Sequence, residues 1–147
     1  MLKVVPKNAS GWKNYKTVCV GISMHTANHH GDALAGLLSW ANGSFNDIIL
    51  DVSDTLHRHN YIAKGISPIT AHRKALQDGD DWLAVNAGII RSTTLSPRIF
   101  RWDHWLSHPD FPAIRRQFQK AFESQPVFNS AVVNDALAFY KRTQDNI

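Results

Sequence analysis

The chain has 147 residues, of which 44% are hydrophobic and 19% are charged. This composition can bury the core of one ordinary domain and excludes disordered and collagen-like chains. A single cysteine, Cys19, excludes an internal disulfide framework and a cysteine-based zinc site.

The charge balance is basic, with 16 Lys and Arg against 12 Asp and Glu, and it suits a polyanionic partner. No apolar run approaches the ~20 residues that cross a bilayer. The basic N-terminus also lacks the apolar stretch of a signal peptide. We therefore expect a cytoplasmic protein without a membrane segment.

The first half of the chain predicts two strands and a helix between them. Residues 17–22, TVCVGI, form a β-branched run typical of a buried strand, in which Cys19 would be a small buried thiol. After a polar loop, apolar residues recur at helical spacing from Asp32, and Asn42-Gly43 indicates the end of this helix. Residues 47–52, DIILDV, predict a second buried strand.

The second half is mainly helical in pattern. Ser53 or Asp54 can cap a helix that Gly65 closes. The further predicted elements are a helix over 66–88 that starts after Ser67-Pro68, a strand at 97–101, and helices at 112–123 and 128–142. Alternating strands and helices predict an α/β fold with a parallel sheet, and right-handed crossovers make it Rossmann-like.

Ligands of such sheets bind beyond the carboxyl ends of the strands. Gly21 and Ser23 come at the end of the first strand, and Asp54 follows the second. Gly21 would permit a sharp turn or a close backbone approach, and Ser23 would direct its hydroxyl into the crevice. Gly-x-Ser alone also fits a loop or a helix cap. A nucleophile elbow is excluded, because His25 stands where its second glycine would be.

The histidines raise the question of a metal site. His25, His29 and His30 share one loop, and His57 and His59 share the next helix. Zinc needs three or four converging ligands, whereas residues two apart on a helix point to different faces. No HExxH motif is present. We therefore predict no metal site and expect solvated or hydrogen-bonded histidines.

Basic residues gather in two predicted helices. Arg73 and Lys74 are adjacent in one of them, and Arg115, Arg116 and Lys120 lie in another. Both groups fit an ordinary solvated surface as well as a nucleic-acid contact.

Five segments follow one another along the chain: GIS, HHGDALAGLLSWANGSFNDIIL, DVSDTLHRHNY, AHRKALQDGDDWL and RWDHWL. In order and spacing, from Val18 to about Arg142, they resemble the tRNA-dependent cyclodipeptide synthases. Each segment alone is unspecific, but five in sequence are distinctive. Thr26 stands three residues after Ser23, where one subgroup has asparagine, so the chain resembles the other subgroup.

The resemblance implies a Rossmann-like domain similar to the catalytic domain of class I tyrosyl- and tryptophanyl-tRNA synthetases. It implies that Ser23 accepts the aminoacyl group of a first charged tRNA, and that a second charged tRNA completes a cyclic dipeptide. Neither ATP nor another cofactor is needed, because the tRNA ester is already activated.

The resemblance also implies roles for other residues. Gly21 would help to hold the substrate carbonyl, and Thr26 and Asp54 would lie in the substrate pocket. Arg73 and Lys74 match a basic helix that contacts tRNA in the family.

One departure concerns the end of the chain. Family members continue further, with a Tyr-x-x-x-Glu motif and a later tyrosine that assist proton transfer. Tyr140 is not followed by such a glutamate. We therefore expect a single domain over 1–147 whose C-terminal part is missing, so that its synthase activity is impaired. The alternatives are a non-catalytic tRNA-binding protein of the same fold and an unrelated hydrolase-like enzyme that uses Ser23.

Overall fold

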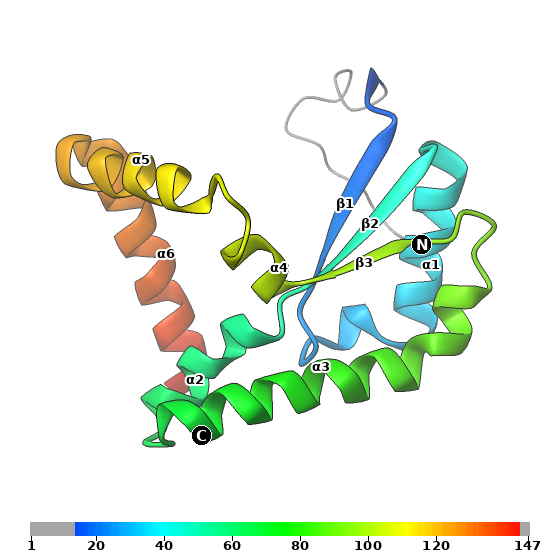
Figure 1. The fold of residues 1–147 in the computed structure, drawn as a ribbon, viewed down its shortest axis with the longest axis horizontal. Coiled ribbons are helices and arrows are strands. Elements are labelled where there is room, and N and C mark those ends of the chain that lie inside the picture. Colours follow the sequence, from blue (N-terminus) through cyan, green and yellow to red (C-terminus); the bar gives the residue numbers. More distant parts are fainter. Residues whose placement is uncertain (1–13, 145–147) are drawn as a thin grey trace. The chain divides into compact units, whose positions relative to one another are not determined.

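The computed structural model describes residues 14–144, with side chains described for 14–138 and 141. Its sheet has three parallel strands in the order β1-β2-β3: β1 (Thr17–Ile22), β2 (Asp47–Val52) and β3 (Arg98–Arg101) (Figure 1). The predicted α/β fold with a parallel sheet is confirmed, and the first two strands have the predicted bounds.

Helical elements connect and follow the strands. They are η2 (Ala27–His29), α1 (Gly31–Ser44), η3 (Thr55–His57), α2 (Arg58–Ala63), α3 (Pro68–Arg91), α4 (Trp102–Leu106), α5 (Phe111–Ser124) and α6 (Pro126–Gln144). Asp54 caps η3, and Gly65, at φ +83°, follows the end of α2, as predicted. The short helix α4 was not predicted.

The predicted stop of α1 at Asn42-Gly43 is wrong, because the helix continues to Ser44. Its buried face, formed by Leu34, Leu38 and Ala41, holds the helix against the sheet through this point. The Asn42 side chain accepts a hydrogen bond from Leu95 N–H at 2.8 Å, so it contributes to tertiary structure.

The core lies between one face of the sheet and the helices α1 and α3. It contains Ile22, Leu34, Leu38, Ile48, Leu50, Val52, Trp82 and Ile90. Burial alternates along β1 and β2, which places every second side chain in this core and the others on the opposite face.

The expectation that Cys19 is buried is wrong, because its thiol is exposed. The run TVCVGI predicted a strand covered on both faces. In the structure Val20 and Ile22 point into the core, while Cys19 and Gly21 lie on the opposite face. Desolvation, and then the charge of Asp51, still raise the pKa of the Cys19 thiol.

The chain divides into two compact units, Met1–Trp105 and Leu106–Ile147. The first contains the sheet and the elements up to Trp105. In the second, α5 packs against α6, where the rings of Phe118 and Phe128 lie 6.1 Å apart. The single domain over 1–147 and its missing C-terminal part stay predictions.

Candidate active site

Ser23 follows directly after β1, at the carboxyl end of the sheet. It starts a tight turn, because Thr26 N–H donates to the Ser23 carbonyl at 3.1 Å. Ser53 N–H donates to the Ile22 carbonyl at 3.1 Å, so the segments after β1 and β2 begin side by side. The structure thus brings both sequence-predicted site segments to the edge where ligands of parallel sheets bind. Ser23 is half-buried and Thr26 is exposed.

Two adjacent histidines hold the loop that carries Ser23. The Ser23 N–H donates to Nδ1 of His29 at 2.8 Å. Nε2 of His30 lies 2.6 Å from the Met24 carbonyl. The indole N–H of Trp82, in α3, donates to the His29 carbonyl at 2.9 Å, which fixes the loop to the core. The prediction of hydrogen-bonded histidines is confirmed for this pair.

Gly21 does not turn the chain, so of the two expected roles, a sharp turn or a close backbone approach, the turn is not found. It lies inside β1, opposite Asp51 of β2, and the turn forms only after Ser23. A Cβ at Gly21 would meet no atom within 4 Å, so the space above it is open. Because the Ile22 carbonyl bonds to Ser53, the backbone groups of Gly21 point to the other edge of β1.

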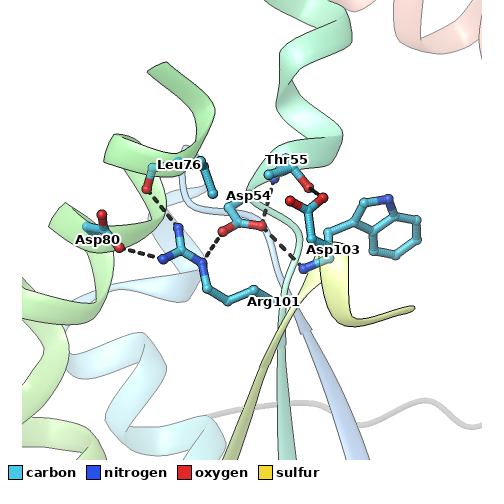
Figure 2. A network of polar contacts seen from close by, with 7 residues as sticks. Asp54, Thr55, Leu76, Asp80, Arg101 and Asp103 are labelled. Atoms are coloured by element: carbon cyan, nitrogen blue, oxygen red, sulfur yellow. Dashed lines mark hydrogen bonds and ion pairs between the residues drawn. The ribbon is translucent and has the colours of Figure 1, made fainter. Parts of the chain in front are cut away.

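Asp54 is fully buried, and its carboxylate oxygens accept hydrogen bonds from other groups of the protein (Figure 2). Oδ2 accepts a hydrogen bond from Nε of Arg101. Oδ1 accepts from Thr55 N–H at 2.7 Å and from Trp102 N–H at 3.2 Å. The Thr55 hydroxyl donates in turn to Asp103 at 2.6 Å. Asp54 therefore ties the end of β2 to the start of α4, and its predicted place in a substrate pocket stays a prediction.

Arg101 joins this network to α3 (Figure 2). It donates to the Leu76 carbonyl at 2.8 Å and to the carboxylate of Asp80. A Cβ at Gly79 would lie 2.6 Å from Nη2 of Arg101 and 2.8 Å from Cβ of Asp54, so the close approach requires glycine. Desolvation opposes the charged guanidinium, but the hydrogen bonds to Asp54 and Asp80 outweigh it and raise the pKa of Arg101.

Sequence reasoning missed Arg101 and Gly79, although the sequence carries a signal for each. Asp54 comes two residues after β2 and Arg101 ends β3, so opposite charges meet at the carboxyl ends of neighbouring strands. Gly79 interrupts a long helical pattern between acidic residues, which is a mark of close packing.

Aromatic side chains of β3 and α4 form a wall over the sheet face that carries Gly21. The rings of Phe100 and His104 stack with centroids 4.3 Å apart, and Trp105 packs edge-on against both, at 5.4 and 5.0 Å. The Trp105 indole N–H donates to Asp51 at 2.8 Å. Because Asp51 is the register partner of both Gly21 and Phe100, the wall stands beside the open space above Gly21.

A polar cluster links the Ser23 loop to α2 and α3. Nε2 of His25 lies 3.4 Å from the carboxylate of Asp78, which also accepts a hydrogen bond from the Tyr61 hydroxyl. The rings of His25 and His57 meet edge-on at 4.8 Å. Nζ of Lys74 lies 5.4 Å from the centroid of the Tyr61 ring, a cation–π contact.

The environment of this cluster changes two pKa values. Burial, and then the neighbouring His25, lower the pKa of His57. Burial, and then the hydrogen bond to Asp78, raise the pKa of Tyr61 to about 12. Both shifts favour the uncharged forms of His57 and Tyr61 at neutral pH.

The predicted tRNA-binding residues lie on the surface. Arg73 and Lys74 are exposed on α3, one to two turns before Asp78. In the other unit, Arg115, Arg116 and Lys120 are exposed on α5.

The described residues support neither a metal site nor a membrane-spanning helix. Within 14–144, no group of three or more His, Cys, Asp or Glu side chains could hold a metal ion. In the same part of the chain, no helix is long and apolar enough to span a membrane.

A sequence profile described as Cyclodipeptide synthase matches residues 5–145. The chain belongs to the cyclodipeptide synthase family. The match covers nearly the whole chain, so the predicted family is confirmed, while the subgroup indicated by Thr26 stays a prediction. A comparison with curated protein sequences finds no significant match.

Solved structures of the family share this fold. A CDPS from Fluoribacter dumoffii superposes with a TM-score of 0.86 at 24% identity, over 92% of this chain and 63% of that chain. AlbC, a cyclodipeptide synthase from Streptomyces noursei, superposes with a TM-score of 0.68 at 22% identity, over 80% of this chain and 57% of that chain. A Mycobacterium tuberculosis protein superposes with a TM-score of 0.64 at 15% identity, over 82% of this chain and 55% of that chain. The structure of that protein relates cyclodipeptide synthetases to type I tRNA synthetases. The chain thus spans less than two thirds of these relatives.

Proposed function

We propose that this chain transfers the aminoacyl group of a charged tRNA to the hydroxyl of Ser23, as a step in the formation of a cyclic dipeptide. The observation that carries the proposal is the position of Ser23. It starts the turn at the carboxyl end of β1, two residues after Gly21, above which the space is open. A substrate carbonyl placed beside Gly21, at the edge of β1 away from β2, would lie within reach of the Ser23 hydroxyl.

The first step is an ester exchange. The Ser23 oxygen attacks the carbonyl carbon of the aminoacyl ester, and the bond from that carbon to the terminal ribose oxygen of the tRNA breaks. The serine proton passes to the ribose oxygen, so the products are an aminoacyl-serine ester and an uncharged tRNA. The reaction needs no ATP or other cofactor, because the tRNA ester is already activated.

Two further steps complete the cyclic product. The amine of the aminoacyl-serine attacks the ester carbonyl of a second aminoacyl-tRNA, which releases that tRNA and leaves a dipeptide on Ser23. The terminal amine of the dipeptide then attacks the serine ester, which closes the ring and frees the hydroxyl. Each step exchanges one ester bond for an ester or an amide.

The surroundings of Ser23 support roles for three more residues. The N–H of Gly21 points to the edge of β1 that faces away from β2, where it would donate to the oxygen of the attacked carbonyl. Thr26 is exposed in the turn that Ser23 starts, and it would line the substrate pocket. Asp54 would shape this pocket indirectly, by fixing Trp102 N–H and thereby the aromatic wall.

Arg73 and Lys74 support recognition of tRNA. Both are exposed on the same helix that anchors the Ser23 loop through Trp82. Tyr61 orients Lys74 through the cation–π contact, which leaves its charge at the surface for a phosphate. Because tRNAs are charged in the cytoplasm, we place the protein there.

A non-catalytic tRNA-binding protein is the second candidate. One observation favours it: among the described side chains, none forms a hydrogen bond to the Ser23 hydroxyl, which is a poor nucleophile unaided. In that case Arg73 and Lys74 would bind tRNA while Ser23 stays unmodified.

Product analysis separates these functions. The purified chain is incubated with tRNA, the twenty amino acids, ATP and aminoacyl-tRNA synthetases, and the mixture is examined by mass spectrometry. Cyclic dipeptides that disappear with Ser23→Ala identify the synthase. Binding of charged tRNA without a product and without a protein ester identifies the non-catalytic protein.

A further inference from the structure

We propose that His29 is a positioning residue for Ser23: the lone pair of its Nδ1 accepts the Ser23 N–H and holds the turn that carries the nucleophile. This inference rests on the proposed function of Ser23. His29 is not among the site residues that the sequence predicted, and the family match assigns no role to it.

The backbone of Ser23 determines which tautomer His29 adopts. Nδ1 lies 2.8 Å from Ser23 N and 3.1 Å from Ser23 O, so it could accept from the first or donate to the second. The Ser23 carbonyl already accepts a hydrogen bond from Thr26 N–H. The Ser23 N–H has no other acceptor among the described residues, and a partly buried donor without a partner is destabilising. His29 therefore carries its proton on Nε2.

His29 can hold Ser23 because it is itself held. Its N–H donates to the Thr26 carbonyl at 2.9 Å, and its carbonyl accepts from the indole N–H of Trp82 at 2.9 Å. Trp82 is 2% exposed and belongs to the core under the sheet. A continuous set of hydrogen bonds thus leads from α3 through Trp82 and His29 to the backbone of Ser23.

The neighbouring His30 provides a contrast within the same loop. Its Nε2 lies 2.6 Å from the Met24 carbonyl, and a carbonyl can only accept. His30 therefore donates with Nε2, whereas His29 accepts with Nδ1. The two histidines use opposite ring nitrogens in opposite roles, so they require different replacements.

The function of this arrangement is to restrain the nucleophile. Without the bond to His29, Ser23 itself keeps, among the described residues, only the hydrogen bond that its carbonyl accepts from Thr26 N–H. Its hydroxyl then loses a fixed position relative to the open space above Gly21. A displacement of about 1 Å can cost about 100-fold in rate. His29 touches Ser23 through the backbone and does not contact the substrate, so it acts by positioning.

Three substitutions of His29 test whether its Nδ1 accepts the hydrogen bond from the Ser23 N–H. In His29→Asn the side-chain oxygen takes the place of Nδ1, in His29→Gln the amide reaches the place of Nε2, and His29→Ala removes the acceptor. Hydrogen exchange of the Ser23 amide, measured by NMR, needs no substrate. We expect protection to persist in His29→Asn and to fall about tenfold or more in His29→Gln and His29→Ala, as expected when a bond of ~1.4 kcal/mol is lost.

The same variants are then compared in the rate of ester formation from charged tRNA. His29→Asn should stay within about threefold of the wild type, while His29→Ala should lose about 10–100-fold at unchanged tRNA affinity. His59→Gln, at an exposed histidine of α2 outside the Ser23 loop, is the matched control and should behave as the wild type. The global free energy of unfolding is measured for each variant.

The outcomes separate this inference from the proposed function. Equal loss of Ser23 protection in all three His29 variants, or full protection in His29→Ala, would overturn the inference. A rate of ester formation that falls in parallel with global stability, with no rescue in His29→Asn, would also overturn it. If the wild type forms no ester, the proposed function fails, and a protected Ser23 amide that depends on the Nδ1 acceptor would still establish the structural contact.

Discussion

Gly79 lets α3 pass over the end of β3 because the guanidinium of Arg101 occupies the place of its missing side chain. A Cβ at this position would lie 2.6 Å from Nη2 of Arg101 and 2.8 Å from Cβ of Asp54. Glycine in a helix interior costs about 1 kcal/mol relative to alanine, so the helix gives up local stability for this contact.

Gly79→Ala should therefore lower the free energy of unfolding by about 2–4 kcal/mol, through overpacking and damage to the buried ion pair. Gly88, in the same helix, has no atom within 4 Å of its Cβ position, so Gly88→Ala should be neutral or should stabilise by up to about 1 kcal/mol. Chemical denaturation of both variants checks the difference. Equal effects of the two substitutions would contradict this role of Gly79.

The two acidic partners of Arg101 should differ sharply in their contribution to stability. Asp54 is fully buried, whereas the side chain of Asp80 is 58% exposed. Asp54→Asn should cost about 3–5 kcal/mol, because it leaves the guanidinium without its buried counter-charge. Asp80→Asn should cost less than about 1 kcal/mol, as surface ion pairs do. Unfolding curves of both variants measure this, and a larger loss for Asp80→Asn would refute the ranking.

The position of Cys19 on the open sheet face predicts its reactivity. Its thiol is exposed, so a maleimide should modify it in the native protein without denaturant. Since burial, and then Asp51, raise its pKa above the ordinary value of 9.0, the labelling rate should keep rising with pH beyond 9. Asp51→Asn should increase the rate at pH 8, because the thiolate loses a repelling charge. A thiol that reacts only after unfolding would show that this face is covered.

Local patterns were sufficient to predict most of the fold. The β-branched runs at 17–22 and 47–52 are short and lie between polar segments, so their identity as strands could be read directly. Pro68 and Gly65 likewise mark where helices begin and end. These signals depend on neighbouring residues only.

Features that depend on distant residues were missed or predicted wrongly. Cys19 was expected to be buried because a run of apolar residues does not reveal how many faces of its strand are covered. Asn42 was expected to end a helix because its bond to Leu95, 53 positions away, is invisible in the local pattern. Arg101 was missed for the same reason: its partners are Asp54, which precedes η3, and Leu76 and Asp80 of α3.

The basic residues of α3 should contribute to tRNA binding through phosphate contacts. Arg73→Ala combined with Lys74→Ala should weaken binding and reduce the slope of log K against log salt by about 1.4–1.8, for two lost contacts. Filter binding or fluorescence anisotropy at several salt concentrations measures this slope. Arg115→Ala with Arg116→Ala, a pair of equal charge on α5, is the matched comparison. A change of slope for that pair alone would move the tRNA site to α5.

Ser23 should carry the aminoacyl group, and the most direct test is the mass of the protein after reaction with charged tRNA. Intact-mass and peptide analysis of the wild type should show one added aminoacyl group on the peptide that contains Ser23. The group should be removed by mild alkali, as expected of an ester. Ser23→Ala should bind tRNA with similar affinity and carry no such group. An equal adduct on Ser23→Ala, or an unmodified wild-type protein while charged tRNA is bound, would contradict the account.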